Sequence, residues 1–167
     1  MDVFNEQIVK IKNGAKNISL KILLWLAALL LVFLTFLFID YLNTIAIIII
    51  GGLFYGAYKL SSRLNVEYEY ILTNGELDVD KIVAQSTRRR MVTIKCSDIE
   101  KVGKYSAGLK THGKFLMCCN PSENAFYVLA RDTKNEAVCL VMEPNDKMKN
   151  GIKGYLPRII QKGAFED

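Results

Sequence analysis

Three adjacent arginines, Arg88, Arg89 and Arg90, are the residues of this sequence whose type and spacing most clearly predict a binding site. Guanidinium groups pair with phosphate and carboxylate oxygens, so the cluster predicts contact with an anionic lipid or with an acidic partner. Successive residues of a strand point to opposite faces, so the three side chains cannot all face one surface of a strand. A solvated loop is the alternative interpretation.

The other residues capable of chemistry do not form a recognisable active site. The chain has His112 as its only histidine and four cysteines, which are Cys96, Cys118, Cys119 and Cys139. Their spacing lacks the C-x-x-C pair of zinc sites, and free cysteine commonly acts as a small buried hydrophobe. Asp78 and Asp80 share a strand face, as solvated strand residues do, and no phosphate-binding loop or nucleophile motif is present. We therefore predict no catalytic residue, metal or cofactor, and a protein that is not an enzyme.

Two long apolar runs organise the rest of the chain. They are Ile22–Ile39 and Tyr41–Tyr58, separated by Asp40, and each is close to the ~20 residues that a helix needs to cross a bilayer. We predict a transmembrane helical hairpin over residues 22–62. A pair of helices buried in a soluble core is the alternative, but a chain of 167 residues has little other apolar surface to surround them.

Small residues predict where the two helices of the hairpin touch. A bend near Tyr41 brings Ala27 and Ala28 to the depth of Gly56, and Gly52 and Gly56 form a small-xxx-small pair that permits close helix packing. We expect the two alanines to face Gly56. Alternatively these glycines are incidental, since glycine is common in membrane helices.

Basic residues flank the hairpin on one side only. Lys10, Lys12, Lys16 and Lys21 precede it, and Lys59 and Arg63 follow it, while the turn has none. The positive-inside rule then predicts two spans with both termini in the cytoplasm. Long Ile and Leu runs with frequent Lys and Asn fit an AT-rich bacterial genome, so we expect the inner membrane of a bacterial cell. The formal charge of +5 is explained by orientation and attraction to anionic headgroups rather than by nucleic acid. The cysteines would lie in a reducing compartment, so disulfides are not expected.

Residues 1–21 are predicted to form an amphipathic segment ahead of the hairpin. Apolar residues recur there every three or four positions, which suits a helix lying on the inner membrane surface. A plain cytosolic extension of the first span is the alternative.

Residues 63–167 are predicted to form a cytosolic β domain. From Val66 the apolar period becomes two, Asn74-Gly75 supplies a tight hairpin turn, and further strands are expected up to residue 142. Pro144 suits the first turn of a closing helix. The helix would place Met148, Ile152 and Ile159 on one apolar stripe, with a kink near Pro157.

This order of elements resembles the bacterial pleckstrin-homology-like domains of small membrane proteins. The likeness rests on Tyr68–Leu77 with its Thr-Asn-Gly turn, on Met91–Val102 with its Asp-Ile-x-x-Val segment, and on Glu143-Pro144-Asn145. The whole chain is most similar to an uncharacterised family of small Firmicute membrane proteins. The implied fold is an α+β membrane protein whose seven-stranded antiparallel barrel or sandwich is partly open and covered at one end by the C-terminal helix.

The resemblance implies a binding role. Eukaryotic relatives hold phosphoinositide headgroups with basic residues around the first strand turn, whereas here that turn is Asn74-Gly75-Glu76 and is followed by Asp78 and Asp80. We expect a membrane-anchored scaffold that presents its domain to a protein partner or to anionic lipid. The alternative is an accessory subunit of a transporter or envelope complex, assembled through the hairpin in the lipid bilayer.

Overall fold

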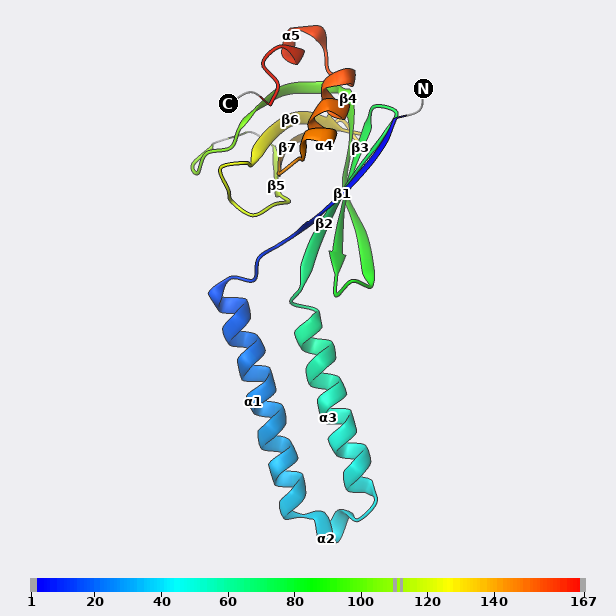
Figure 1. The fold of residues 1–167 in the computed structure, drawn as a ribbon, viewed down its shortest axis with the longest axis vertical. Helices are drawn as coiled ribbons and strands as arrows, with labels where there is room; N and C mark the ends of the chain where they lie inside the picture. The colour runs from blue at the N-terminus through cyan, green and yellow to red at the C-terminus, as the bar shows by residue number, and fades with distance from the viewer. Residues whose placement is uncertain (1–2, 110, 112, 166–167) are drawn as a thin grey trace. The chain divides into compact units, whose positions relative to one another are not determined.

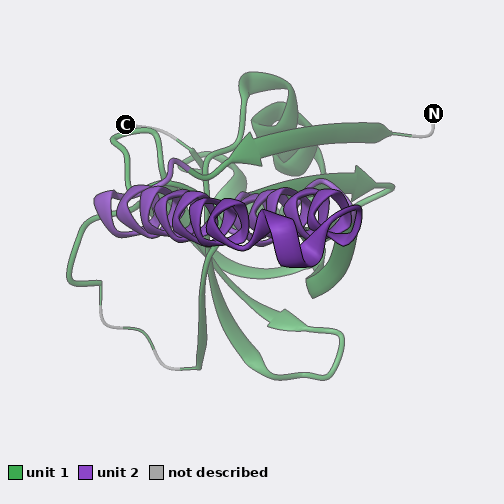
Figure 2. Cartoon of the chain, turned by 90° about the horizontal axis from the view of Figure 1, so that it is seen from below, with its two compact units in different colours: residues 1–11, 67–82, 87–167 green, residues 12–66, 83–86 purple. Residues whose placement is uncertain are grey.

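A computed structural model describes residues 3–109, 111 and 113–165, and the chain divides into two compact units (Figure 2). Unit 1 contains residues 1–11, 67–82 and 87–167, and it holds the β-sheet. Unit 2 contains residues 12–66 and 83–86, and it holds the apolar helices. His112, the only histidine of the sequence, lies outside the described residues.

Unit 2 is a helical hairpin of α1 (Ala15–Leu37) and α3 (Ile45–Ser62), joined by the short α2 (Ile39–Leu42) (Figure 1). Both long helices have the length and composition needed to cross a membrane. The predicted helical hairpin is therefore present, although α1 begins seven residues before the first apolar run because Ala15–Lys21 also adopts helical geometry. The turn between β3 and β4 also belongs to this unit, and there the Ala84 N–H donates to the carbonyl of Asn65 at 3.0 Å.

The helices of the hairpin contact each other through one stripe of small and β-branched residues. Its buried members are Ala28, Val32 and Thr35 of α1 and Ala46 and Ala57 of α3. Thr35 donates its hydroxyl to the carbonyl of Leu31 at 2.9 Å, so its polar group is satisfied within the helix.

Of the residues predicted to pack the hairpin, Ala28 lies on this stripe. Ala27 and Gly52 are exposed, and Gly56 is half-buried. A Cβ atom built on Gly52 or Gly56 would meet nothing within 4 Å. A contact made specifically by these glycines stays a prediction, since the space beside them admits a methyl group.

Unit 1 is built on one seven-stranded sheet in the order β1-β2-β3-β4-β6-β7-β5. Its strands are β1 (Phe4–Lys10), β2 (Val66–Thr73), β3 (Glu76–Val83), β4 (Thr87–Lys104), β5 (Lys114–Met117), β6 (Phe126–Asp132) and β7 (Ala137–Met142). The predicted Asn-Gly turn joins β2 to β3, with positive φ angles of 47° at Asn74 and 88° at Gly75. The further strands expected up to residue 142 include β6 and β7, which pair antiparallel.

The helix expected in residues 1–21 is wrong for its first half, because Phe4–Lys10 forms strand β1. This strand pairs with β2 in a continuous antiparallel register from Phe4↔Thr73 to Lys10↔Glu67. Apolar residues occur on both of its faces, so the sequence shows no clean period of two. Pairing with β2 decides the conformation, since it satisfies the backbone groups of alternate residues along the strand.

The predicted antiparallel barrel or sandwich is corrected in two respects. The expected partly open barrel or sandwich is one sheet that is not closed, since its order ends at β1 on one side and at β5 on the other. β5 also runs parallel to β7, which is possible because residues 118–136, including β6, connect the two strands. β4 is one strand of 18 residues, and its pairing with β6 shifts register between Ile94 and Ile99 and again before Lys101. Such irregularities bend a strand, so one strand contributes to both ends of the core.

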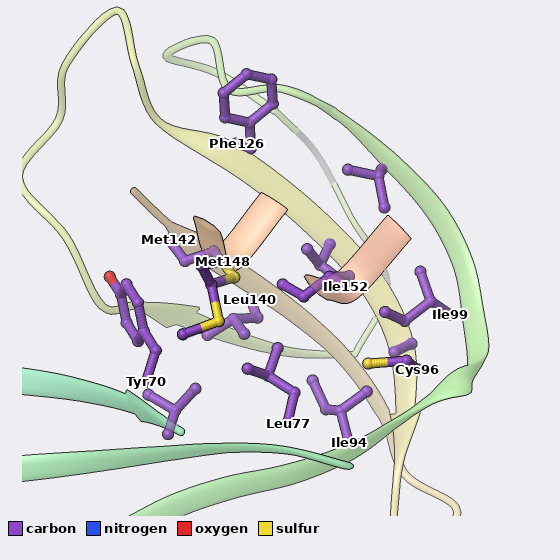
Figure 3. Packing of buried hydrophobic residues seen from close by; sticks show 14 of the residues in the cluster. Tyr70, Leu77, Ile94, Cys96, Ile99, Phe126, Leu140, Met142, Met148 and Ile152 are labelled. Carbon is purple, nitrogen blue, oxygen red and sulfur yellow. The ribbon is translucent and has the colours of Figure 1, made fainter. Parts of the chain in front are cut away.

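The hydrophobic core of unit 1 is covered by helix α4 (Asp146–Tyr155). Met148 and Ile152 point from it toward Leu77 and Leu140 of the sheet (Figure 3), and both are fully buried. The helix ends before Pro157, which caps the short α5 (Arg158–Gln161). This break confirms the interruption predicted near Pro157. It also makes the expected role of Ile159 wrong, because that side chain is 95% exposed.

Candidate functional site

The register of β1 and β2 assigns their side chains to two faces of the sheet. Asn5, Gln7 and Val9 face the core side, whereas Phe4, Glu6, Ile8 and Lys10 face outward. Opposite residues of an antiparallel pair share a face, so Glu69 lies on the outer face beside Ile8. This outer face carries most of the charged side chains considered below.

Five charged residues of β2, β3 and β4 form two neighbouring groups of ion pairs, here together called the ion-pair cluster. Its members are Glu69, Asp78, Asp80, Arg88 and Arg90. It has three carboxylates and two guanidinium groups. Two of the carboxylate residues, Glu69 and Asp80, are only 1% and 2% exposed.

Arg90 holds two carboxylates of β3 at once. Its Nη1 lies 2.6 Å from Asp78 Oδ2, and its Nε donates to Asp80 Oδ1. Thr93 adds a third bond to this group, since its hydroxyl donates to Asp78 Oδ1 at 2.5 Å. Hydrogen bonding to Asp80 raises the pKa of Arg90, so the guanidinium is charged throughout the usual pH range.

Arg88 pairs with the buried Glu69 across the sheet. Its Nη2 lies 2.9 Å from Oε1 and 2.8 Å from Oε2 of that carboxylate. Burial raises the pKa of Glu69, and a hydrogen bond from the neighbouring Glu6 side chain acts in the same direction, while Arg88 opposes both. Arg88 therefore provides the positive charge that a buried carboxylate needs.

The three arginines predicted to bind an anionic surface therefore have different environments in the structure. Arg88 and Arg90 form ion pairs with carboxylates of their own sheet. Arg89 is exposed, and no ion pair of its side chain is seen among the described residues. Contact with anionic lipid through these arginines stays a prediction, but two of the three charges are already neutralised locally.

Two polar residues of β1, missed in the sequence, attach the strand to the start of α4. Gln7 donates from Nε2 to the carbonyl of Glu143 at 2.8 Å and accepts from the Asn145 N–H at 2.8 Å. Asn145 in turn caps α4, since its Oδ1 accepts from the Met148 N–H at 2.8 Å. The side chain of Asn5 lies so close to α4 that a Cβ at Gly151 would be 2.6 Å from its Nδ2. No sequence signal identifies this contact, because it depends on β1 being a strand.

The four cysteines lie in or beside the core. Burial raises the pKa of Cys96, Cys118 and Cys119 to about 12, and it raises the pKa of Cys139 as well. A thiol with so high a pKa is almost entirely protonated at neutral pH, so it is a poor nucleophile and a poor metal ligand. Among the described residues, no group of three His, Cys, Asp or Glu side chains is placed to hold a metal ion.

A hollow of about 320 Å³ lies beside the turn between β2 and β3. It is lined by Asn74, Gly75, Glu76, Lys95, Ser97 and Tyr155. The ring of Tyr155 packs on Gly75, where a Cβ would be 2.8 Å from the ring carbon Cδ1. Glycine is therefore required at this position both for its positive φ angle and for the contact with α4.

The arrangement of one open sheet covered by a C-terminal helix agrees with the comparison to known families. Residues 1–162 match the family described as Bacterial PH-like domain (DUF6106). The chain belongs to this family. The matched region includes β1 and the helical hairpin as well as the rest of the sheet. No curated protein and no solved structure matches the chain.

Proposed function

We propose that this bacterial PH-like protein is a non-enzymatic binding module held at the cytosolic surface of the inner membrane by its helical hairpin. The family is known by its domain type, and PH-like domains are typically binding modules. The proposal adds a location and a class of partner, which is another protein.

The observation that carries the proposal is the pairing of β1 with β2 on either side of the hairpin. Lys10 pairs with Glu67, so the chain leaves the sheet for the hairpin and returns to it at opposite residues of one strand pair. Four residues separate β1 from α1 and three separate α3 from β2. The domain is therefore attached to the hairpin through two short connections rather than one.

The ion-pair cluster favours a protein partner over lipid headgroups. A headgroup site needs cations that are free to contact phosphate, yet Arg88 and Arg90 are paired with three carboxylates. The same outer face exposes Phe4 and Ile8. Apolar side chains surrounded by charged groups are typical of protein-binding surfaces.

Labelling of introduced cysteines tests the location. In intact spheroplasts, a membrane-impermeant maleimide is expected to label Tyr41→Cys in the hairpin turn, where the native side chain is 89% exposed. Thr133→Cys, in the exposed β6–β7 loop, should react only after permeabilisation. The native cysteines provide a low background because all four are buried. Labelling of Thr133→Cys in intact cells, or protection of Tyr41→Cys, would contradict the proposed topology.

Crosslinking from native membranes tests the binding role and separates it from the alternative of an accessory subunit assembled through the hairpin. The decisive variant replaces residues 12–63 by an unrelated two-span anchor and keeps β1, because removing Phe4–Lys10 would destroy the sheet edge. We expect the same protein to be crosslinked to both chains. Loss of that protein with a folded exchange variant would instead favour assembly through the hairpin.

A further inference from the structure

Strand β1 has one side without a neighbouring strand, because it lies at the end of the sheet. In an antiparallel pair, alternate residues direct their N–H and C=O groups toward the partner strand. The Asn74 N–H donates to the carbonyl of Val3 at 3.0 Å, which continues the β1–β2 ladder with odd-numbered residues facing β2. The backbone groups of Phe4, Glu6, Ile8 and Lys10 therefore point to the open side.

This open side has the features of an edge that accepts another strand. Asn120 Nδ2 donates to the carbonyl of Lys10 at 3.0 Å. Within the described part of the chain, no hydrogen bond is seen from the backbone groups of Phe4, Glu6 or Ile8. The strand contains no proline, and its register with β2 is unbroken over seven residues, so two usual protections of an edge, a proline and a bulge, are missing. The side chains of Phe4 and Ile8 are 60% and 50% exposed.

When two copies of this edge are paired, their charges are complementary in one register. Two copies of β1 can pair antiparallel through their open sides in three registers, which have Glu6, Gln7 or Ile8 at the centre of the symmetric pair. The first register places Glu6 opposite Glu6, which is repulsive, and the second leaves Glu6 and Lys10 opposite apolar residues. The third places Ile8 opposite Ile8 and matches Glu6 of each copy with Lys10 of the other. Within one copy the Lys10 ammonium lies 3.8 Å from Glu67, but its side chain is 75% exposed and can also contact the second copy. Opposite charges on facing strands stabilise a pair, and like charges destabilise it.

We propose that this edge is the interface of a symmetric dimer, in which β1 of a second copy of the chain pairs antiparallel with β1 about Ile8. Such an interface is isologous, since the same patch serves both subunits.

Disulfide crosslinking of the full chain in isolated membranes tests the dimer. In the proposed register the Cα atoms at position 8 are about 5.5 Å apart, which suits a disulfide. Ile8→Cys should therefore give a reducible dimer with a mild oxidant. Phe4→Cys is the matched control, because it is exposed on the same face but would lie eight residues, or roughly 26 Å, from its counterpart. No dimer from Ile8→Cys, or equal dimer from both variants, would overturn the proposal.

Charge exchange tests the register. In the Ile8→Cys background, Glu6→Lys alone and Lys10→Glu alone should each reduce the yield of dimer severalfold, because each places like charges opposite one another. The combined exchange restores opposite charges and should restore the yield. A folded double variant that crosslinks no better than the single variants would rule out this pairing. Neither outcome depends on the partner protein of the proposed function.

Discussion

Ile152→Ala is expected to lower the free energy of unfolding of the β domain by about 2–5 kcal/mol, the range for removing a large aliphatic side chain from a core. Ile152 is fully buried between α4 and the sheet. Gly151 and Asn145 hold α4 close to β1, so the surrounding chain has little freedom to fill the cavity. Denaturation of the detergent-solubilised full chain, followed by the β-sheet signal in circular dichroism, measures the loss.

Ile159→Ala is the matched control for this prediction. It removes the same atoms from a residue that follows α4 by only a few positions but is 95% exposed. Its effect should be within about 0.5 kcal/mol, as for most surface substitutions. Similar losses from both variants would mean that α5 also packs against the core, which would contradict the break between α4 and α5 at Pro157.

This pair of isoleucines also shows what the sequence could predict about the closing helix. The spacing of Met148 and Ile152 identifies the buried stripe because both residues lie in one uninterrupted helix. Ile159 continues the same spacing, but this spacing places it on the buried face only if the helix is continuous through Pro157. The proline cap at Pro157 redirects the chain, so the stripe ends at Leu156, which is buried.

Local patterns predicted the elements whose partners are close in sequence. The apolar runs predicted the hairpin, and Asn74-Gly75 predicted the β2–β3 turn because positive φ angles are required there. β1 was not predicted, since its partner β2 lies beyond the whole hairpin. The parallel pairing of β5 with β7 is equally non-local, because nothing in Lys114–Met117 specifies the direction of its neighbour.

The candidate site was only partly predictable for the same reason. Three adjacent arginines indicate a concentration of positive charge, and charge alone suggests an anionic ligand. The carboxylates that neutralise Arg88 and Arg90 come from β2 and β3, up to 19 residues away. Their positions depend on strand register, because a shift of one residue would move each side chain to the opposite face of the sheet.

Arg90→Ala is expected to lower the free energy of unfolding by about 2–3 kcal/mol, because it leaves Asp80 buried without its cation. Breaking a fully buried ion pair costs about 3–5 kcal/mol, and the smaller value applies here because the side chain of Arg90 is 49% exposed and water can partly replace it. Denaturant titration of the full chain measures the change. Arg89→Ala is the matched control, since it removes an exposed guanidinium from the adjacent residue and should change stability by no more than about 0.5 kcal/mol.

A second substitution distinguishes lost charge compensation from lost packing by the arginine stem. If the uncompensated carboxylate causes the loss, Asp80→Asn should recover part of the stability of Arg90→Ala, because the buried group is then neutral. The same Asp80→Asn change in the wild-type background should instead destabilise the domain, since it removes the negative charge that pairs with Arg90 and replaces one of the two acceptor oxygens by a donor NH2 group. Opposite signs of this one substitution in the two backgrounds are the expected signature of a coupled ion pair. If Asp80→Asn is destabilising in both, Arg90 acts mainly through the packing of its aliphatic stem against β3.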